Sequence, residues 1–177
     1  HAGQGCAFTT RLVVPRARYD EAVAAAAEAM RRVPLGDPTD PATVCGPLIS
    51  ARQRDRVLGY LDLAVAEGGW FACGGGRPAG LDRGYFVSPT VIGGLTNDAR
   101  VAREEIFGPV LVVLTHDGDD DAVRIANDSP YGLSATVWGS AERAALVAAR
   151  LRTGTVNVNG GVWYSADAPF GGYKQSG

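Results

Sequence analysis

Apolar and polar residues along this chain form blocks that switch repeatedly between helical and strand periods. Across residues 19–33, apolar side chains recur at helical spacing, and alanine, the best helix former, dominates the segment. Residues 110–114 are instead five consecutive apolar residues, which is typical of a strand buried on both faces of a parallel sheet. The pattern therefore predicts helices and strands in alternation.

The same patterns predict the remaining elements. Short strands are expected at residues 12–14, 70–73, 90–92, 134–138 and 155–158. Helices are expected at residues 51–67, 119–127 and 140–152, with a brief one at 98–104. Strands that alternate with helices indicate an α/β domain with an open, largely parallel twisted sheet flanked by helices.

Three of these helices have polar residues at their starts. Ser50 and Gln53 have the spacing of a capping box, in which each side chain satisfies a backbone N–H of the other residue. Ser140 is expected to cap the helix that follows it. The helix from residue 119 opens with three aspartates, whose negative charge complements the helix dipole. Consecutive carboxylates face different directions, so we interpret them as a helix start and expect no metal site.

Composition excludes several classes of protein. The chain has 177 residues, 46% of them hydrophobic, which is enough to bury a sizeable core. The net charge is −2 and there is no basic run, so we expect no nucleic-acid partner. No apolar run is long enough to cross a membrane. The 3 cysteines lack CxxC spacing, which argues against a disulfide framework or a zinc site and favours a reducing, cytoplasmic setting.

Cys6 is the candidate nucleophile. It follows Gly-Gln-Gly at residues 3–5, where glycines allow other groups to approach the backbone closely. A thiol attacks through its thiolate, which nearby cationic groups favour. The alternative for an isolated cysteine is a small buried packing residue, and this is our interpretation of Cys45 and Cys73.

Later stretches connect Cys6 with a known family. They read Glu-Glu-Ile-Phe-Gly-Pro-Val at residues 104–110, Asn-Asp-Ser-Pro-Tyr-Gly-Leu-Ser at 127–134, Gly-Thr-Val-Asn-Val-Asn at 154–159 and Pro-Phe-Gly-Gly-Tyr-Lys-Gln-Ser-Gly at 169–177. With these motifs in this order, the chain resembles the catalytic half of an aldehyde dehydrogenase over nearly its whole length.

The resemblance implies oxidation of an aldehyde to a carboxylic acid with NAD or NADP. The Cys6 thiolate would add to the aldehyde to form a thiohemiacetal, hydride would leave to the nicotinamide, and water would hydrolyse the resulting thioester. In the family, the backbone N–H of this cysteine and an asparagine outside residues 1–177 stabilise the oxyanion.

The resemblance also assigns the cofactor and substrate contacts. Glu105 would bind the hydroxyls of the nicotinamide ribose and Phe107 would contact the nicotinamide end, whereas a solvated acidic pair and a core aromatic are the competing interpretations. Glu104 is expected to be a structural neighbour. The aromatic residues of the last loop would line the substrate pocket: Trp163, Tyr164 and Phe170.

Core packing is the competing interpretation for Phe170. Asn159 is expected to fix the loop by hydrogen bonds, and Lys174 is expected to have a structural role.

The family's cofactor-binding domain, its general base and its oligomerisation strand would lie outside residues 1–177. The parent enzyme is expected to be a homo-oligomer, dimer or tetramer, and this chain alone to show little or no NAD-dependent oxidation. Three alternatives stay open: an acylating, coenzyme-A-dependent enzyme or a reductase of the same fold, a Cys6-dependent esterase, and a non-catalytic assembly module.

Overall fold

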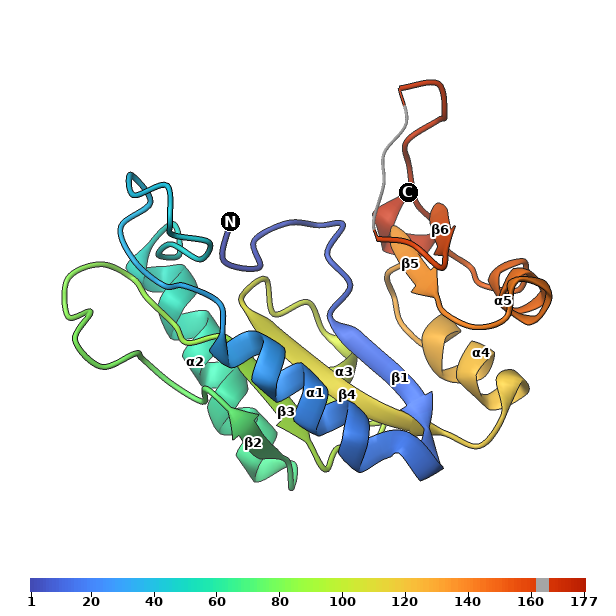
Figure 1. Ribbon diagram of the computed structural model, residues 1–177, viewed down its shortest axis with the longest axis horizontal. Coiled ribbons are helices and arrows are strands. Elements are labelled where there is room, and N and C mark those ends of the chain that lie inside the picture. The colour runs from blue at the N-terminus through green and yellow to red at the C-terminus, as the bar shows by residue number, and fades with distance from the viewer. Residues whose placement is uncertain (162–165) are drawn as a thin grey trace. The chain divides into compact units, whose positions relative to one another are not determined.

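The computed structural model describes residues 1–161 and 166–177 and shows two compact units. Unit 1 comprises His1–Gly5 and Thr10–Thr115, and unit 2 comprises Cys6–Thr9 and His116–Gly177. Each unit has its own β-sheet and its own helices (Figure 1).

Unit 1 is built on a four-stranded sheet with the strand order β1-β4-β3-β2. Its strands are β1 (Arg11–Pro15), β2 (Trp70–Cys73), β3 (Thr90–Gly93) and β4 (Val110–His116). The central strands β3 and β4 are parallel, with Thr90 opposite Val110, whereas β2 pairs with β3 in the antiparallel direction. The long apolar strand predicted at residues 110–114 is confirmed as β4, a central strand.

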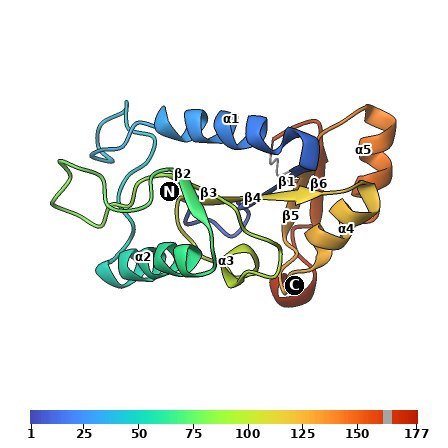
Figure 2. The ribbon, with the colours of Figure 1, turned by 90° about the horizontal axis from the view of Figure 1, so that it is seen from below.

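Helices cover both faces of this sheet. Figure 2 shows α1 (Tyr19–Arg31) on one face and α2 (Ala51–Ala66) with α3 (Arg100–Arg103) on the other; a short 3-10 helix (Arg16–Arg18) precedes α1. The core on the α1 side forms where Val23 packs with Val91 and Val113 of the sheet. The buried face of α2 consists of Val57, Leu61 and Ala64.

Two details of these helices differ from the prediction. The apolar spacing of this helix predicts an inner stripe of Leu58, Leu61, Ala64 and Val65, but Val65 is 56% exposed, and the buried stripe consists of Val57, Leu61 and Ala64. The brief helix predicted at residues 98–104 is the single turn α3.

Unit 2 contains a two-stranded parallel sheet of β5 (Ser134–Val137) and β6 (Thr155–Val158). Its helices are α4 (Asp119–Asn127), α5 (Ala141–Ala148) and the 3-10 helix η2 (Lys174–Ser176). The α5 helix ends at Ala148, before the predicted residue 152, and Ser140 makes no side-chain hydrogen bond to it. Ser140 is thus the N-cap residue of α5 as predicted, but its side chain does not bond the helix.

Ion pairs occupy the acidic start of α4. Asp119 pairs with Arg143 at 2.7 Å, and Asp120 pairs with Arg150 at 2.8 Å. Asp121 pairs with Arg124 at 2.7 Å. Among the described residues, no group of three or more His, Cys, Asp or Glu side chains could hold a metal ion.

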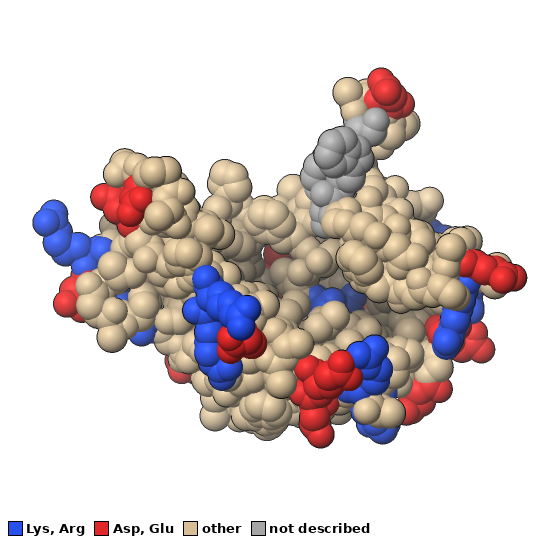
Figure 3. Space-filling model, in the orientation of Figure 1, with Lys and Arg blue, Asp and Glu red and all other residues tan. Residues whose placement is uncertain are grey.

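The surface carries mixed charges. On the face drawn in Figure 3, basic and acidic side chains are interspersed over both units, and no continuous basic patch is visible there. None of the described helices has the length and apolar character needed to cross a membrane.

Candidate active site

The nucleophile segment begins with an unusual backbone conformation. Ala2 and Gly3 have positive φ values of 50° and 71°. A Cβ on Gly3 would lie 2.0 Å from the carbonyl oxygen of Gly108, far closer than a carbon atom can approach. Glycine is therefore required at this position, both for the left-handed backbone and for the close contact.

Gln4, the next residue, fixes the segment by hydrogen bonds. Its Oε1 accepts a hydrogen bond of 3.0 Å from the backbone N–H of Ile49, and its Nε2 donates one of 3.1 Å to the His1 carbonyl. The sequence before the candidate nucleophile is thus anchored within unit 1.

Cys6 is exposed, and all three cysteines are free thiols. The residue after it is held within unit 2, where the Ser134 hydroxyl donates a hydrogen bond of 2.7 Å to the Ala7 carbonyl. Cys45, in contrast, is buried, and burial raises the pKa of its thiol. Cys73 is half-buried. Exposure therefore separates Cys6 from the two cysteines that we interpreted as packing residues.

Glu105 and Phe107 belong to a short loop between α3 and β4 that we call the rim segment, residues 105–108. Glu105 is exposed, and its carboxylate makes no hydrogen bond to any residue that the structure describes. Phe107 is half-buried and has a φ of 60°, a left-handed conformation that is uncommon outside glycine. The next residue, Gly108, is buried, and a Cβ there would lie 2.6 Å from a methyl carbon of Val57.

Side chains of α2 bind the carbonyl groups of this segment. Gln53 Nε2 donates to the Ile106 carbonyl at 3.2 Å and to the Phe107 carbonyl at 2.8 Å. Arg56 donates to the Glu105 carbonyl. The Gln53 side chain therefore does not close the predicted capping box, although its backbone N–H bonds the Ser50 hydroxyl at 3.2 Å as expected.

Glu104 is a structural neighbour of the rim segment, as predicted. Its carboxylate accepts hydrogen bonds from Arg100 at 2.7 Å and from the Tyr60 hydroxyl at 2.8 Å. These bonds, first the one from Arg100 and then the one from Tyr60, lower the pKa of Glu104. Burial, followed by the hydrogen bond to Glu104, raises the pKa of Tyr60.

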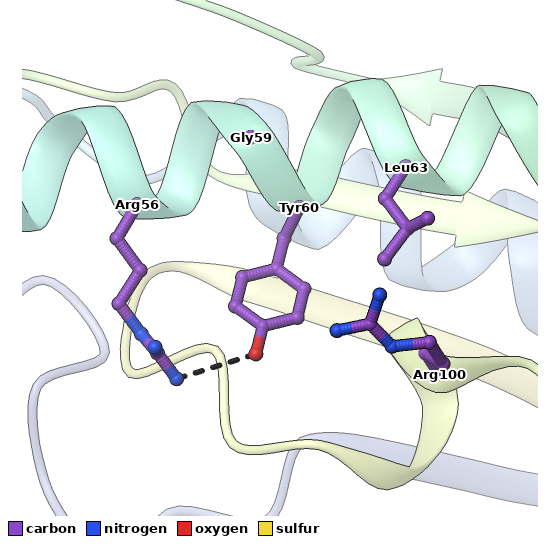
Figure 4. Close-up of a pocket in the computed structure, with 5 residues that line it drawn as sticks. All are labelled: Arg56, Gly59, Tyr60, Leu63 and Arg100. Atoms are coloured by element: carbon purple, nitrogen blue, oxygen red, sulfur yellow. Dashed lines mark hydrogen bonds between the residues drawn. The ribbon is translucent and has the colours of Figure 1, made fainter.

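An open pocket of about 390 Å³ lies beside this network. Figure 4 shows its lining, with Arg56 and Arg100 extending on either side of the Tyr60 ring. The Arg56 guanidinium lies 5.0 Å from the centroid of that ring, a cation–π distance. The pocket is thus bordered by the same side chains that hold Glu104 and the Glu105 carbonyl.

The predicted substrate aromatics follow β6 in the sequence. Phe170 is 65% exposed, so the core-packing interpretation of this residue is wrong. Trp163 and Tyr164 lie outside the described residues. The pocket assignment of all three residues stays a prediction.

Lys174 has the structural role that was predicted, whereas Asn159, expected to fix the last loop, bonds the turn after β5. The Asn159 side chain accepts a hydrogen bond from the Gly139 N–H and donates one to the Gly139 carbonyl, both at 2.9 Å. Lys174 donates from its Nζ to the carbonyls of Asn127 at 2.7 Å, Ser129 at 2.9 Å and Tyr131 at 3.4 Å. Asn159 thus ties β6 to the turn after β5, and Lys174 ties the last residues to the turn after α4.

Two further residues of the rim segment's environment, Gln53 and Arg56, have no signal in the sequence that marks them as site residues. Gln53 fits a capping position and Arg56 lies on an exposed helix face, so neither has a local signal of its role. Their carbonyl partners are about fifty positions away in the chain, and only the fold brings them together.

The comparisons with known proteins agree with these motifs. Residues 1–177 match the profile of the aldehyde dehydrogenase family. The chain is 49% identical to a geranial dehydrogenase of Castellaniella defragrans, over 99% of the chain and 36% of that protein. It is 44% identical to a betaine aldehyde dehydrogenase of Brucella melitensis, over 99% of the chain and 37% of that protein. The chain therefore belongs to the aldehyde dehydrogenase family.

Solved structures give the same result for the fold. An aldehyde dehydrogenase of Mycobacterium tuberculosis in complex with NAD+ superposes with a TM-score of 0.93 at 49% identity, over 99% of this chain and 36% of that one. A betaine aldehyde dehydrogenase of Staphylococcus aureus in complex with NAD+ superposes with a TM-score of 0.95 at 39% identity, over 99% and 35%. The chain thus spans little more than a third of the length of these relatives.

Proposed function

We propose that this chain is the thiol-bearing catalytic part of a longer aldehyde dehydrogenase that oxidises an aldehyde to a carboxylic acid with NAD or NADP. Family membership and the share of its relatives that the chain spans support this proposal. The relatives are named for different aldehydes, so the proposal specifies the functional group and no particular substrate. The observation that carries it is the exposed Cys6 thiol directly after the anchored Gly3–Gln4 segment.

In this proposal Cys6 performs the covalent chemistry. Its thiolate adds to the carbonyl carbon of the aldehyde, and the backbone N–H of Cys6 donates to the oxygen that becomes negative. NAD or NADP, held by Glu105 and Phe107, would supply the acceptor for the hydride that leaves the carbon atom of the thiohemiacetal as the thioester forms. Water then adds to the thioester carbon, and the carboxylic acid leaves as the Cys6 thiolate is released.

The rim segment has residues suited to the cofactor. The Glu105 carboxylate is exposed and makes no hydrogen bond within the part of the chain that the structure describes, so it can accept hydrogen bonds from two neighbouring ribose hydroxyls. The left-handed Phe107 beside it fits a ligand-clamping segment, where backbone strain tends to concentrate. Glu105 would therefore hold the nicotinamide ribose, and Phe107 would contact the nicotinamide.

The proposal also covers the domain organisation of the parent enzyme and the cellular compartment in which it works. The cofactor-phosphate site, the general base and an oligomerisation strand would come from other parts of the parent enzyme, which would be a homo-oligomer. Three free thiols without a disulfide among the described residues favour a reducing, cytoplasmic compartment.

A direct test uses the full-length enzyme and its Cys6→Ser variant. The wild type is expected to form NADH or NADPH and a carboxylic acid from an aldehyde, and the variant to lose at least about a thousandfold in kcat because a hydroxyl is a far weaker nucleophile. Unchanged turnover in Cys6→Ser would refute the proposed role of the thiol.

Product analysis separates the competing functions. An acyl-coenzyme-A product would favour the acylating enzyme, and turnover of activated esters without any redox reaction would favour the esterase. An unreactive Cys6 in an enzyme without activity would favour the assembly module.

A further inference from the structure

Asn159 lies just after β6, and its side chain joins the ends of the two strands of unit 2. Its Oδ1 accepts a hydrogen bond from the Gly139 N–H and its Nδ2 donates one to the Gly139 carbonyl, both at 2.9 Å. We call these two bonds the Gly139 clasp. Figure 1 shows β5 and β6 side by side, and the clasp closes them just beyond their last paired residues, Val137 and Val158.

The residue after Asn159 is a glycine, which makes this asparagine chemically labile. Asparagine is among the thermolabile residues, because the backbone nitrogen of the next residue can attack its side-chain amide carbon. Glycine hinders this attack least, since it has no Cβ. Of the asparagines at positions 97, 127, 157 and 159, only Asn159 precedes a glycine, whereas Asn157 precedes the β-branched Val158. Asn159 is also exposed, so water has access to it.

We propose that Asn159 is a site of spontaneous deamidation whose rate is set by the opening of the Gly139 clasp. The Gly160 nitrogen forms a bond to the Asn159 Cγ, the bond from Cγ to Nδ2 breaks, and ammonia leaves with the proton of the Gly160 N–H. Water then opens the resulting cyclic imide at one of its two carbonyl carbons, which gives aspartate or isoaspartate. No oxidant or cofactor takes part, so this inference is independent of the proposed function.

The closed clasp opposes the formation of the imide. Both polar atoms of the Asn159 amide are held by Gly139, so a rotation of the side chain toward the Gly160 nitrogen breaks two hydrogen bonds. The Asn159 N–H also donates to the Val137 carbonyl at 2.9 Å, which fixes the backbone at the same point. The reaction therefore requires a local opening of unit 2, and its rate is proportional to the fraction of molecules in which the clasp is open.

Deamidation also prevents the clasp from closing again. A carboxylate has acceptor atoms only, so one oxygen can still accept from the Gly139 N–H while the other faces the Gly139 carbonyl oxygen without a hydrogen atom between them. Isoaspartate adds a carbon atom to the main chain at a residue whose φ of 53° is left-handed, a conformation that asparagine tolerates better than most residues. Either product leaves the ends of β5 and β6 less tightly joined.

The first measurement is the rate of deamidation of each asparagine in the full-length enzyme, read by peptide mass spectrometry after incubation at mildly alkaline pH. In urea, Asn159 is expected to react at least about tenfold faster than Asn157, because glycine follows the one and valine the other. In the folded enzyme, the rate at Asn159 is expected to be at least about tenfold lower than in urea, because the clasp has to open first.

Gly160→Ala is the matched control. A Cβ at Gly160 would lie 3.8 Å from the Val158 carbonyl oxygen, an ordinary van der Waals contact, so this variant keeps the clasp and hinders the attack. Its rate of deamidation at Asn159 is expected to fall at least about fivefold in both folded enzyme and urea. Hydrogen exchange of the Gly139 amide should stay within about twofold of the wild type, because the clasp is intact.

Asn159→Asp tests the consequence of the reaction. Hydrogen exchange in the turn after β5 is expected to be at least about fivefold faster than in the wild type at neutral pH. Below about pH 4 the carboxyl protonates and regains an O–H donor toward the Gly139 carbonyl, so the difference from the wild type should shrink. The protonated form is the one that closes the clasp, and this stability is lost as the pH rises through the pKa of the carboxyl.

Three outcomes would overturn the proposal. Equal rates of deamidation at Asn159 in folded enzyme and in urea would show that the clasp does not control the reaction. Equal rates in the wild type and Gly160→Ala would exclude the attack by the Gly160 nitrogen. Unchanged hydrogen exchange in Asn159→Asp at neutral pH would show that the carboxylate keeps the strand ends joined.

Discussion

Gly3 and Gly108 lie so close that a Cβ on Gly3 would be 2.0 Å from the Gly108 carbonyl oxygen. Gly108 in turn packs against Val57 of α2. Three chain segments distant in sequence are thus stacked in unit 1: the residues before the candidate nucleophile, the rim segment and the helix that supports it.

Gly3→Ala is expected to destabilise the protein by about 3 kcal/mol or more, because the new Cβ meets backbone atoms in a left-handed conformation. Thermal unfolding checks this. Gly76→Ala is the control, since a Cβ at Gly76 would meet nothing within 4 Å and should change stability by no more than about 0.5 kcal/mol. Equal melting temperatures for the two variants would show that the close contact does not constrain the fold.

The cysteines should differ in their rates of alkylation by iodoacetamide at neutral pH. Cys6 is exposed, whereas Cys45 is buried and burial raises the pKa of its thiol, which lowers the fraction of reactive thiolate. Cys6 is expected to react at least about tenfold faster than Cys45, as read by peptide mass spectrometry. The difference should disappear in guanidinium chloride. Faster alkylation of Cys45 in the folded protein would contradict the described burial.

Lys174 is the only lysine among residues 1–177, so amine labelling within this range, read by peptide mass spectrometry, reports on it alone. Its Nζ donates to three carbonyls, so acylation has to wait for local opening of unit 2. We expect acylation of Lys174 by an N-hydroxysuccinimide ester to be at least about tenfold slower in the folded protein than in urea, with a lysine peptide added to both samples as the reference. Equal rates in the two states would show that the three bonds do not persist in solution.

The Glu104 network predicts a pH dependence of stability. The hydrogen bonds from Arg100 and Tyr60 lower the pKa of Glu104 in the folded state. Its contribution is therefore present above the unfolded pKa of about 4.3 and is lost as the pH falls through the lower folded value. Because the carboxylate is partly exposed, the effect should be modest.

Glu104→Gln tests this dependence. The variant should melt below the wild type at pH 7, and the two melting temperatures should converge as the pH is lowered toward 3. A constant difference across that range would mean that the ionised carboxylate is not the stabilising form.

Local patterns were sufficient for much of the fold. The buried strand β4 and the helix α4 follow from an apolar run and from three aspartates that open a periodic segment. Ser140 shows the limit of such signals, because the residue type suits a cap but the side chain makes no bond to the helix. The separation into two units depends on which strands pair, and pairing is a non-local property that periodicity does not encode.

The candidate site likewise contains residues that the sequence predicts and residues that it does not. Cys6 and Glu105 stand in contiguous motifs and could be proposed from the sequence. The support of Glu105 and Phe107 by Gln53 could not, because the same glutamine also satisfies the local pattern of a helix cap. A residue that already has a local explanation gives no sequence signal of a second, long-range role.

Gln53 makes one hydrogen bond through its backbone N–H to Ser50 and another through its side chain to the Phe107 carbonyl. These two bonds limit where α2 tolerates insertions and deletions. The junction before the helix is fixed by the Ser50 cap and by the hydrogen bond from the Ile49 N–H to the Gln4 side chain. One residue inserted between Gln53 and Val57 would rotate Gln53 by about 100° relative to Val57, since a helix has about 3.6 residues per turn. The amide would then point away from the Phe107 carbonyl while Val57 stayed against Gly108. We expect homologous chains to keep the number of residues between Gln53 and Val57 constant.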